Sequence, residues 1–216
     1  MKLQLKNYHE QLPGWPTTGR HIMAQYDQEK VIVYQAYRPA IGHFAATYQR
    51  FGGAFKMDRM TWIKPNFLWM MYRSGWGTKE AQEVTLAIHL KRNAFEAYLK
   101  ASVKSSFDAT QFSDYDSWKQ AIDQSDCRIQ WDPDHDPHGE KLERRAVQIG
   151  LRRSLVSAYV QEDILEIEDI SDFVKEQREH VNKKELQFLI MPDERVYKVN
   201  DKSLVQHLNL DTHVDE

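Results

Sequence analysis

The chain has 216 residues, of which 41% are apolar and 28% are charged, as expected for one ordinary globular domain. Its six Trp, ten Tyr and nine Phe can build a large core, so a disordered chain is excluded except at the ends. No run of about 18 apolar residues occurs, and we expect a soluble cytoplasmic protein with no membrane partner. The single cysteine, Cys127, excludes an intramolecular disulfide and any multi-cysteine metal site.

The net charge of -3 is unevenly distributed along the chain. Residues 38–92 contain nine Lys and Arg against three acidic residues, a balance of +6. Residues 161–216 contain seven basic residues against fifteen acidic ones, a balance of -8. The basic region suits a phosphate-bearing partner, although solvated charged faces that happen to segregate would produce the same numbers.

The first predicted elements lie in the basic half of the chain. Residues 31–37 are β-branched and aromatic and predict a buried strand, which ends where Pro39 follows Arg38. Residues 40–51 have the apolar spacing of an amphipathic helix that ends at two glycines. In residues 84–90, large apolar side chains alternate with smaller or polar ones, which predicts a strand with one wetter face.

Further helices and short strands are expected to alternate towards the C-terminus. The pattern predicts helices at 94–103, 115–122, 154–160 and 172–181, and strands at 128–131, 146–151 and 164–170. We therefore expect an α+β fold in a single domain, residues 1–200, with a central sheet of about five short strands flanked by helices. A polar tail, residues 201–216, is expected to follow.

Residues 59–77 form the first segment whose composition indicates a function. Three Trp, three Met, one Phe and one Tyr are interleaved with Arg59, Lys64 and Arg73. Aromatic rings can stack on a base while basic groups pair with its phosphate, so the segment indicates a pocket for a nucleotide or single-stranded nucleic acid. We expect Arg38, Lys64 and Arg73 to hold phosphate, and Trp62 or Trp76 to stack. The competing interpretation is that these aromatic residues only build the core.

The turn that ends this segment adds candidates of its own. Gly75 and Gly77 flank Trp76, and their backbone N–H groups could form an anion-binding nest beside Arg73. Ser74 precedes the turn and is a candidate nucleophile or hydrogen-bond donor to phosphate.

Residues 128–145 form the second segment, in which a predicted strand leads into a loop rich in Asp and His. We expect Asp134 and His135 to transfer protons, and Arg144 and Arg145 to bind phosphate. In the alternative of a metal-dependent hydrolase, the ligands would be Asp132, Asp134, His135, Asp136 and His138. A loop with exposed histidines would instead indicate a non-enzymatic interaction module. For an enzyme, we expect the two segments to share one cleft.

Several stretches of the chain resemble a known family. They are Val33–Pro39, Arg59–Pro65, Trp69–Trp76, Trp131–His135 and Lys141–Ala146. In these stretches the chain resembles the bacterial and fungal "domain of unknown function 4291" family over roughly residues 30–180. The resemblance implies no activity, cofactor or catalytic residue.

The leading functional hypothesis is that the protein binds a nucleotide or another phosphorylated small molecule, with RNA as a further candidate. A transferase reaction is considered because Arg38, Ser74 and the pair Glu166 and Glu168 loosely match the Arg-Ser-Glu arrangement of ADP-ribosyltransferases. The sequence does not predict a cofactor or an oligomeric state.

Overall fold

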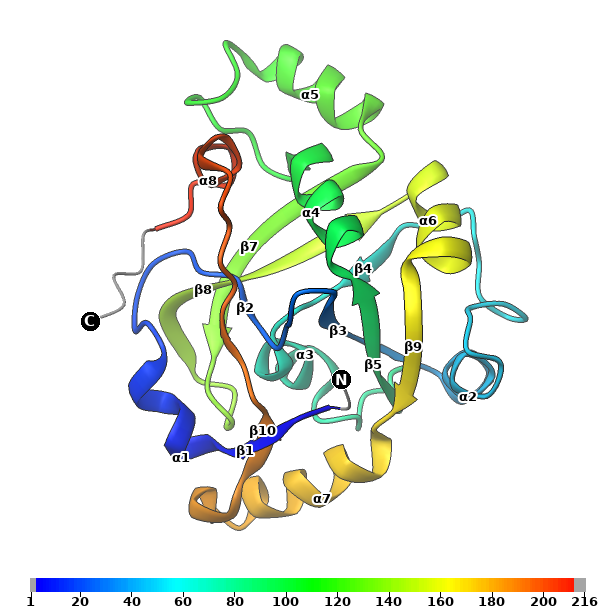
Figure 1. Ribbon diagram of the computed structural model, residues 1–216, viewed down its shortest axis with the longest axis vertical. Coiled ribbons are helices and arrows are strands. Elements are labelled where there is room, and N and C mark those ends of the chain that lie inside the picture. The colour runs from blue at the N-terminus through cyan, green and yellow to red at the C-terminus, as the bar shows by residue number, and fades with distance from the viewer. Residues whose placement is uncertain (1–2, 212–216) are drawn as a thin grey trace.

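The computed structural model describes residues 3–211, which form two main sheets surrounded by helices (Figure 1). The first sheet is antiparallel and has the order β3 (Lys30–Tyr37), β5 (Val84–Lys91) and β9 (Ile164–Asp169). The second has the order β4 (Thr61–Ile63), β8 (Lys141–Leu151), β7 (Cys127–His135) and β6 (Ser102–Lys104), in which only β6 and β7 are parallel. The predicted α+β class is confirmed, and the five expected strands are divided between these two sheets.

Two short ladders join the ends of the chain. β1 (Leu5–Asn7) pairs with β10 (Ile190–Pro192), and β2 (Met23–Ala24) pairs with β11 (Arg195–Val196). Figure 1 shows the late segment in orange running beside the blue N-terminal one. Residues from the two ends of the sequence therefore pack as one layer.

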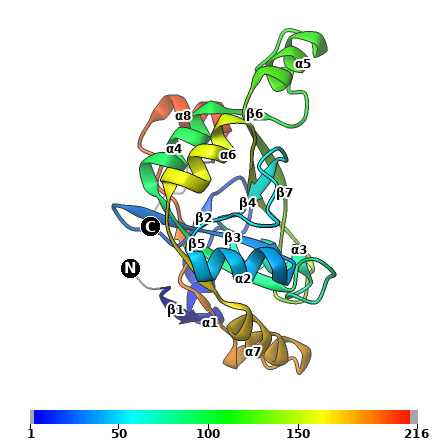
Figure 2. The same ribbon diagram turned by 90° about the vertical axis from the view of Figure 1, so that its right-hand side faces the viewer.

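Eight α-helices lie within the described residues. They are α1 (Tyr8–Gln11), α2 (Pro39–Tyr48), α3 (Phe67–Ser74), α4 (Arg92–Ala101), α5 (Tyr115–Gln124), α6 (Ser154–Ala158), α7 (Ser171–Asn182) and α8 (Lys202–Leu208). Single helical turns of other types occupy Leu12–Gly14, Tyr159–Asp163 and Leu186–Phe188. In Figure 2, α5 projects from one end of the molecule, while α7 lies at the opposite end.

Two apolar clusters cover opposite faces of the β3–β5–β9 sheet. One joins this sheet to β7, β8 and α4, and it includes Val33, Ile88 and Ile149. The other packs the opposite face of β3 and β5 against α3 and α7. The prediction of a wetter, solvent-exposed face on residues 84–90 is therefore wrong, because both faces of β5 are covered and every residue from Val84 to Leu90 is buried.

Several elements differ from the sequence prediction, which did not include β1, α1, β2, β4, β6, β10 or β11. Residues 67–74 form helix α3, in which residues 67–71 are all buried and Tyr72 and Arg73 are exposed; the sequence predicted no helix here. The expected polar tail from residue 201 instead begins with α8, which Asp201 caps and which buries Leu204 and Leu208. The last part of the expected tail, residues 212–216, lies outside the described residues.

Candidate functional site: a basic cleft where the two sheets meet

Two adjoining concavities open where the first sheet meets the second. Their volumes are about 480 and 490 Å³, and both are lined by Tyr37, Met60 and Thr61. We call the pair the basic cleft. The other residues that line it include five basic and four glutamine side chains, together with Trp62 and Phe55: Arg38, Lys56, Arg59, Lys64 and Arg73, and Gln35, Gln82, Gln130 and Gln148. Its size is within the range of small-molecule sites.

Lys64 lies at the point where the two sheets join. Its backbone exchanges two hydrogen bonds with Tyr34 of β3, with N–O distances of 2.7 and 3.2 Å. Pro65 follows and cannot extend the ladder. Asn66 then caps α3 by accepting a 2.6 Å hydrogen bond from the Trp69 N–H. This strand, proline and helix cap bring Lys64 and Arg73 of α3 to the same concavity.

The Lys64 side chain is buried without a counter-ion. It is 6% exposed, and its ammonium group donates to the Trp62 carbonyl at 3.3 Å. Burial, reinforced by the nearby positive charge of Arg73, lowers the pKa of Lys64 to about 7, although Asp132 opposes the shift. The amine therefore changes its protonation state close to neutral pH.

Neutral hydrogen-bonding groups complete the cleft. The Gln35 amide donates to the Thr61 hydroxyl at 2.7 Å and to the Tyr37 hydroxyl at 2.9 Å, while its oxygen accepts from Tyr159 at 2.7 Å. Opposite, Gln130 and Gln148 are cross-strand partners on β7 and β8. Both donate to the Asp132 carboxylate at 2.8 Å. The amides therefore have fixed orientations before any ligand binds.

Five of the residues proposed from the sequence to bind a ligand line the basic cleft: Arg38, Arg59, Trp62, Lys64 and Arg73. Lys56 and the four glutamines were not proposed from the sequence. A signal for Gln35 did exist, since it interrupts an otherwise apolar and aromatic stretch of a predicted strand. The pairing of Gln130 with Gln148 required the register of two strands whose neighbours the sequence did not specify.

The turn at residues 74–77 does not form the expected anion-binding nest. The N–H groups of Gly75 and Trp76 donate to carbonyls of α3, and that of Gly77 donates to the Ser74 hydroxyl at 3.2 Å. Ser74 is fully buried, and its hydroxyl also donates to the Met71 carbonyl at 3.4 Å. The turn is thus a helix C-cap in which Gly75 has the left-handed conformation, with φ of 58°. Neither Ser74 nor the N–H groups are placed to contact a ligand.

Asp134 and His135 lie outside the basic cleft. The Asp134 carboxylate accepts from Nε of Arg144 at 2.8 Å and lies 2.6 Å from its Nη2, and both side chains are buried. His135 stacks on Tyr72 with ring centroids 3.5 Å apart, and burial lowers its pKa despite the opposing charge of Asp134. Desolvation therefore favours the neutral ring of His135.

The two segments nevertheless touch at a different place. Trp76 donates from its indole nitrogen to the Pro137 carbonyl at 3.1 Å, and Trp76, Asp136 and His138 line a separate concavity of about 390 Å³. Arg145 lines another concavity, of about 710 Å³, to which Gln130 also contributes. The expected single site that combines Asp134 and His135 with Arg73 or Trp76 is thus not formed.

Two other sites considered from the sequence are also not formed, because their residues do not lie together. Within residues 3–211, the only group of three or more His, Cys, Asp or Glu donors within 4.8 Å of one another lies on β5 and β9, so Asp132, Asp134, His135, Asp136 and His138 do not form a metal site. The Arg-Ser-Glu arrangement is likewise absent from these residues, because Arg38 lines the cleft whereas Ser74 is buried elsewhere.

Comparison with known proteins identifies the family of this chain. Residues 21–197 match the model of a family described as "Domain of unknown function (DUF4291)", and the chain belongs to that family. The match includes every residue that lines the basic cleft. A search of curated proteins found no match. Among the described residues, no helix has both the length and the hydropathy that crossing a membrane requires.

Proposed function

We propose that the protein binds a nucleotide or a related phosphorylated small molecule in the basic cleft. The observation that carries this proposal is the uncompensated positive charge of the cleft. Five basic side chains line it, and no Asp or Glu is among the lining residues that the structure describes. A ligand with two or more negative charges would supply the missing counter-charge.

The basic groups are available to such a ligand. None of Arg38, Lys56, Arg59, Lys64 and Arg73 takes part in the ion pairs formed within the described residues. Arg73 is exposed on α3, and its planar guanidinium can bind two phosphate oxygens at once. Lys64 would approach the same phosphate from the floor of the cleft, where the low dielectric strengthens the attraction.

The remaining lining residues suit the other parts of a nucleotide. Trp62 is half-buried at the rim, where its indole ring can stack on a base. Gln130 and Gln148 provide amide groups that can recognise polar edges or sugar hydroxyls. A nucleotide would thus place its charge near Lys64 and Arg73 and its flat apolar surface near Trp62.

Isothermal titration calorimetry with AMP, ADP, pyrophosphate and a short single-stranded RNA tests the proposal. We expect micromolar binding of at least one nucleotide and about tenfold weaker binding by Arg73→Lys, because lysine keeps the charge but loses the planar fork. Trp62→Phe should abolish the ligand-dependent change in tryptophan fluorescence. RNA as the ligand would show a steeper loss of affinity with salt than a mononucleotide.

Arg50→Lys is the matched control, because Arg50 is exposed in the same basic region but does not line the cleft. It should leave affinity unchanged, and both variants should melt at the wild-type temperature. Absence of binding at millimolar concentrations, or equal effects of the two substitutions, would contradict the proposal.

A further inference from the structure

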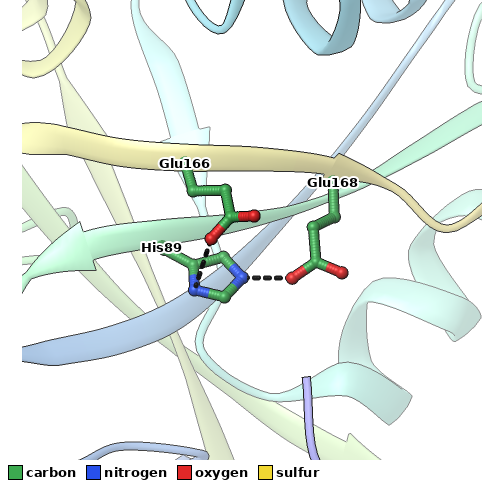
Figure 3. A group of neighbouring side chains, drawn as sticks. All are labelled: His89, Glu166 and Glu168. Carbon is green, nitrogen blue, oxygen red and sulfur yellow. Dashed lines mark hydrogen bonds and ion pairs between the residues drawn. The ribbon is translucent and has the colours of Figure 1, made fainter. Parts of the chain in front are cut away.

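A second polar cluster lies on the β3–β5–β9 sheet, away from the basic cleft (Figure 3). His89 of β5 is directly opposite Glu166 of β9, and Glu168 is opposite the residue two positions earlier on β5. Alternate residues of a strand face the same side, so the two carboxylates flank one imidazole. None of the three side chains lines the cleft.

The imidazole is fully buried, whereas the two carboxylates reach the surface. The side chain of His89 is 0% exposed, compared with 50% for Glu166 and 30% for Glu168. Its Nε2 donates to the Glu168 carboxylate at 2.5 Å. Its Nδ1 is buried without a hydrogen-bond partner and faces Oε2 of Glu166 at 3.8 Å, as Figure 3 shows.

This geometry leaves two electron-rich atoms facing each other. In the neutral imidazole, a carboxylate that accepts from one ring nitrogen selects the tautomer with the proton on that nitrogen, which leaves a lone pair on the other. The lone pair of Nδ1 then points towards a carboxylate oxygen, at a distance too long for a hydrogen bond. A buried nitrogen without a partner is unfavourable, and a cation between the two atoms would satisfy both.

We propose that His89 and Glu166 bind a divalent transition-metal ion such as Zn²⁺, with Glu168 positioning the imidazole. Bonds from Zn²⁺ to His nitrogen and carboxylate oxygen are about 2.0–2.2 Å, so one ion spans the 3.8 Å between Nδ1 and Oε2. The arrangement in which a carboxylate holds a metal-bound histidine is a recurrent one. Because Glu166 is half-exposed, water or a ligand would complete the coordination.

The chain contains a comparable pair that lacks the third group. Nδ1 of His180 lies 3.7 Å from the Glu185 carboxylate, yet this pair is not part of a group of three donors within the described residues. It therefore provides a matched control for a histidine and carboxylate that are near each other without forming a metal site.

The test is equilibrium dialysis of metal-free protein against Zn²⁺ and, separately, Co²⁺, with metal content measured by mass spectrometry. We expect one ion per chain, together with visible Co²⁺ absorption bands that indicate a nitrogen ligand. Glu166→Gln should weaken binding by more than about 100-fold, because it removes a ligand rather than an outer-shell partner. Glu168→Gln should weaken it by about 10-fold to 100-fold.

Glu185→Gln should leave the metal affinity unchanged. Circular dichroism confirms that each variant is folded, and Glu166→Gln is the decisive one because its side chain is half-exposed. Wild-type protein that binds less than one tenth of an equivalent of either metal would overturn the proposal, as would equal binding by Glu166→Gln and wild type. In that case His89 is an imidazole held only by hydrogen bonding to Glu168.

Discussion

The basic cleft and the Asp134–Arg144 pair are both rich in charge, but the fold neutralises only one of them. Arg144 lies against Asp134, donates to the Pro16 carbonyl at 2.8 Å and covers the Trp15 ring at 5.0 Å. Lys64 is equally buried, yet its ammonium group contacts only a carbonyl oxygen. Charge that is satisfied inside the fold contributes to structure, whereas charge left without a counter-ion is available to a ligand.

The largest effect is expected from breaking the satisfied pair. Asp134→Asn keeps the shape of the side chain but leaves the buried Arg144 guanidinium without its counter-charge. We expect the free energy of unfolding to fall by about 3–5 kcal/mol, measured by urea denaturation. The double variant Asp134→Leu with Arg144→Met should recover much of this loss, because it removes both charges. A loss below about 1 kcal/mol for Asp134→Asn would show that the pair is not structural.

The unsatisfied lysine should have a pH-dependent effect on stability. Lys64 has a pKa of about 7 in the folded protein, below the ordinary lysine value of 10.5. Folding therefore releases its proton above pH 7, and the contribution of Lys64 to stability becomes more favourable as pH rises from 7 towards 10.5. Between pH 6 and 8, we expect the unfolding free energy of the wild type to rise by about 1 kcal/mol relative to Lys64→Met. Parallel pH profiles for the two proteins would contradict this electrostatic description of the cleft.

Ligand binding should depend on the same proton. A bound anion raises the pKa of Lys64 because it stabilises the ammonium form, so binding takes up a proton above pH 7. We expect the affinity for ADP to fall several-fold between pH 7.5 and 9, a range in which the phosphate groups are already ionised. Calorimetry in buffers with different ionisation enthalpies measures this proton uptake directly, and Lys64→Met should remove it.

The smallest effect is expected at an exposed ion pair. The loss of unfolding free energy on removing one charge of a pair should depend on how deeply the pair is buried and not on charge alone. Nη1 of Arg153 lies 3.4 Å from the Asp126 carboxylate, and the arginine side chain is 56% exposed. Arg153→Gln should change the unfolding free energy by less than about 0.5 kcal/mol, because water screens both charges. Thermal and urea unfolding alongside Asp134→Asn provide the comparison, and similar losses in the two variants would remove the distinction between buried and exposed pairs.

Local sequence patterns were sufficient to predict most of the longer helices and strands. The strand at 31–37 and the helix at 172–181 follow from apolar periodicity and from breaking residues, which act over a few neighbouring positions. The same reasoning identified residues 59–77 as a source of ligand-binding side chains, and Lys64 and Arg73 do line the cleft. Helix α3 was not predicted because residues 67–72 are a short continuous apolar run, and periodicity alone does not distinguish a buried helix from a buried strand in such a run.

Only the tertiary structure decided which polar residues have partners. Asp134 and Lys64 both lie in segments that contain several charged residues, and nothing local to either one determines that Asp134 meets Arg144 while Lys64 meets no carboxylate. The same holds for His89, whose neighbours Glu166 and Glu168 are brought to it by the register of β5 and β9. The attraction between two charged or polar side chains falls off over a few ångströms in space. Which side chains become partners therefore depends on how strands pair and sheets pack rather than on spacing along the chain.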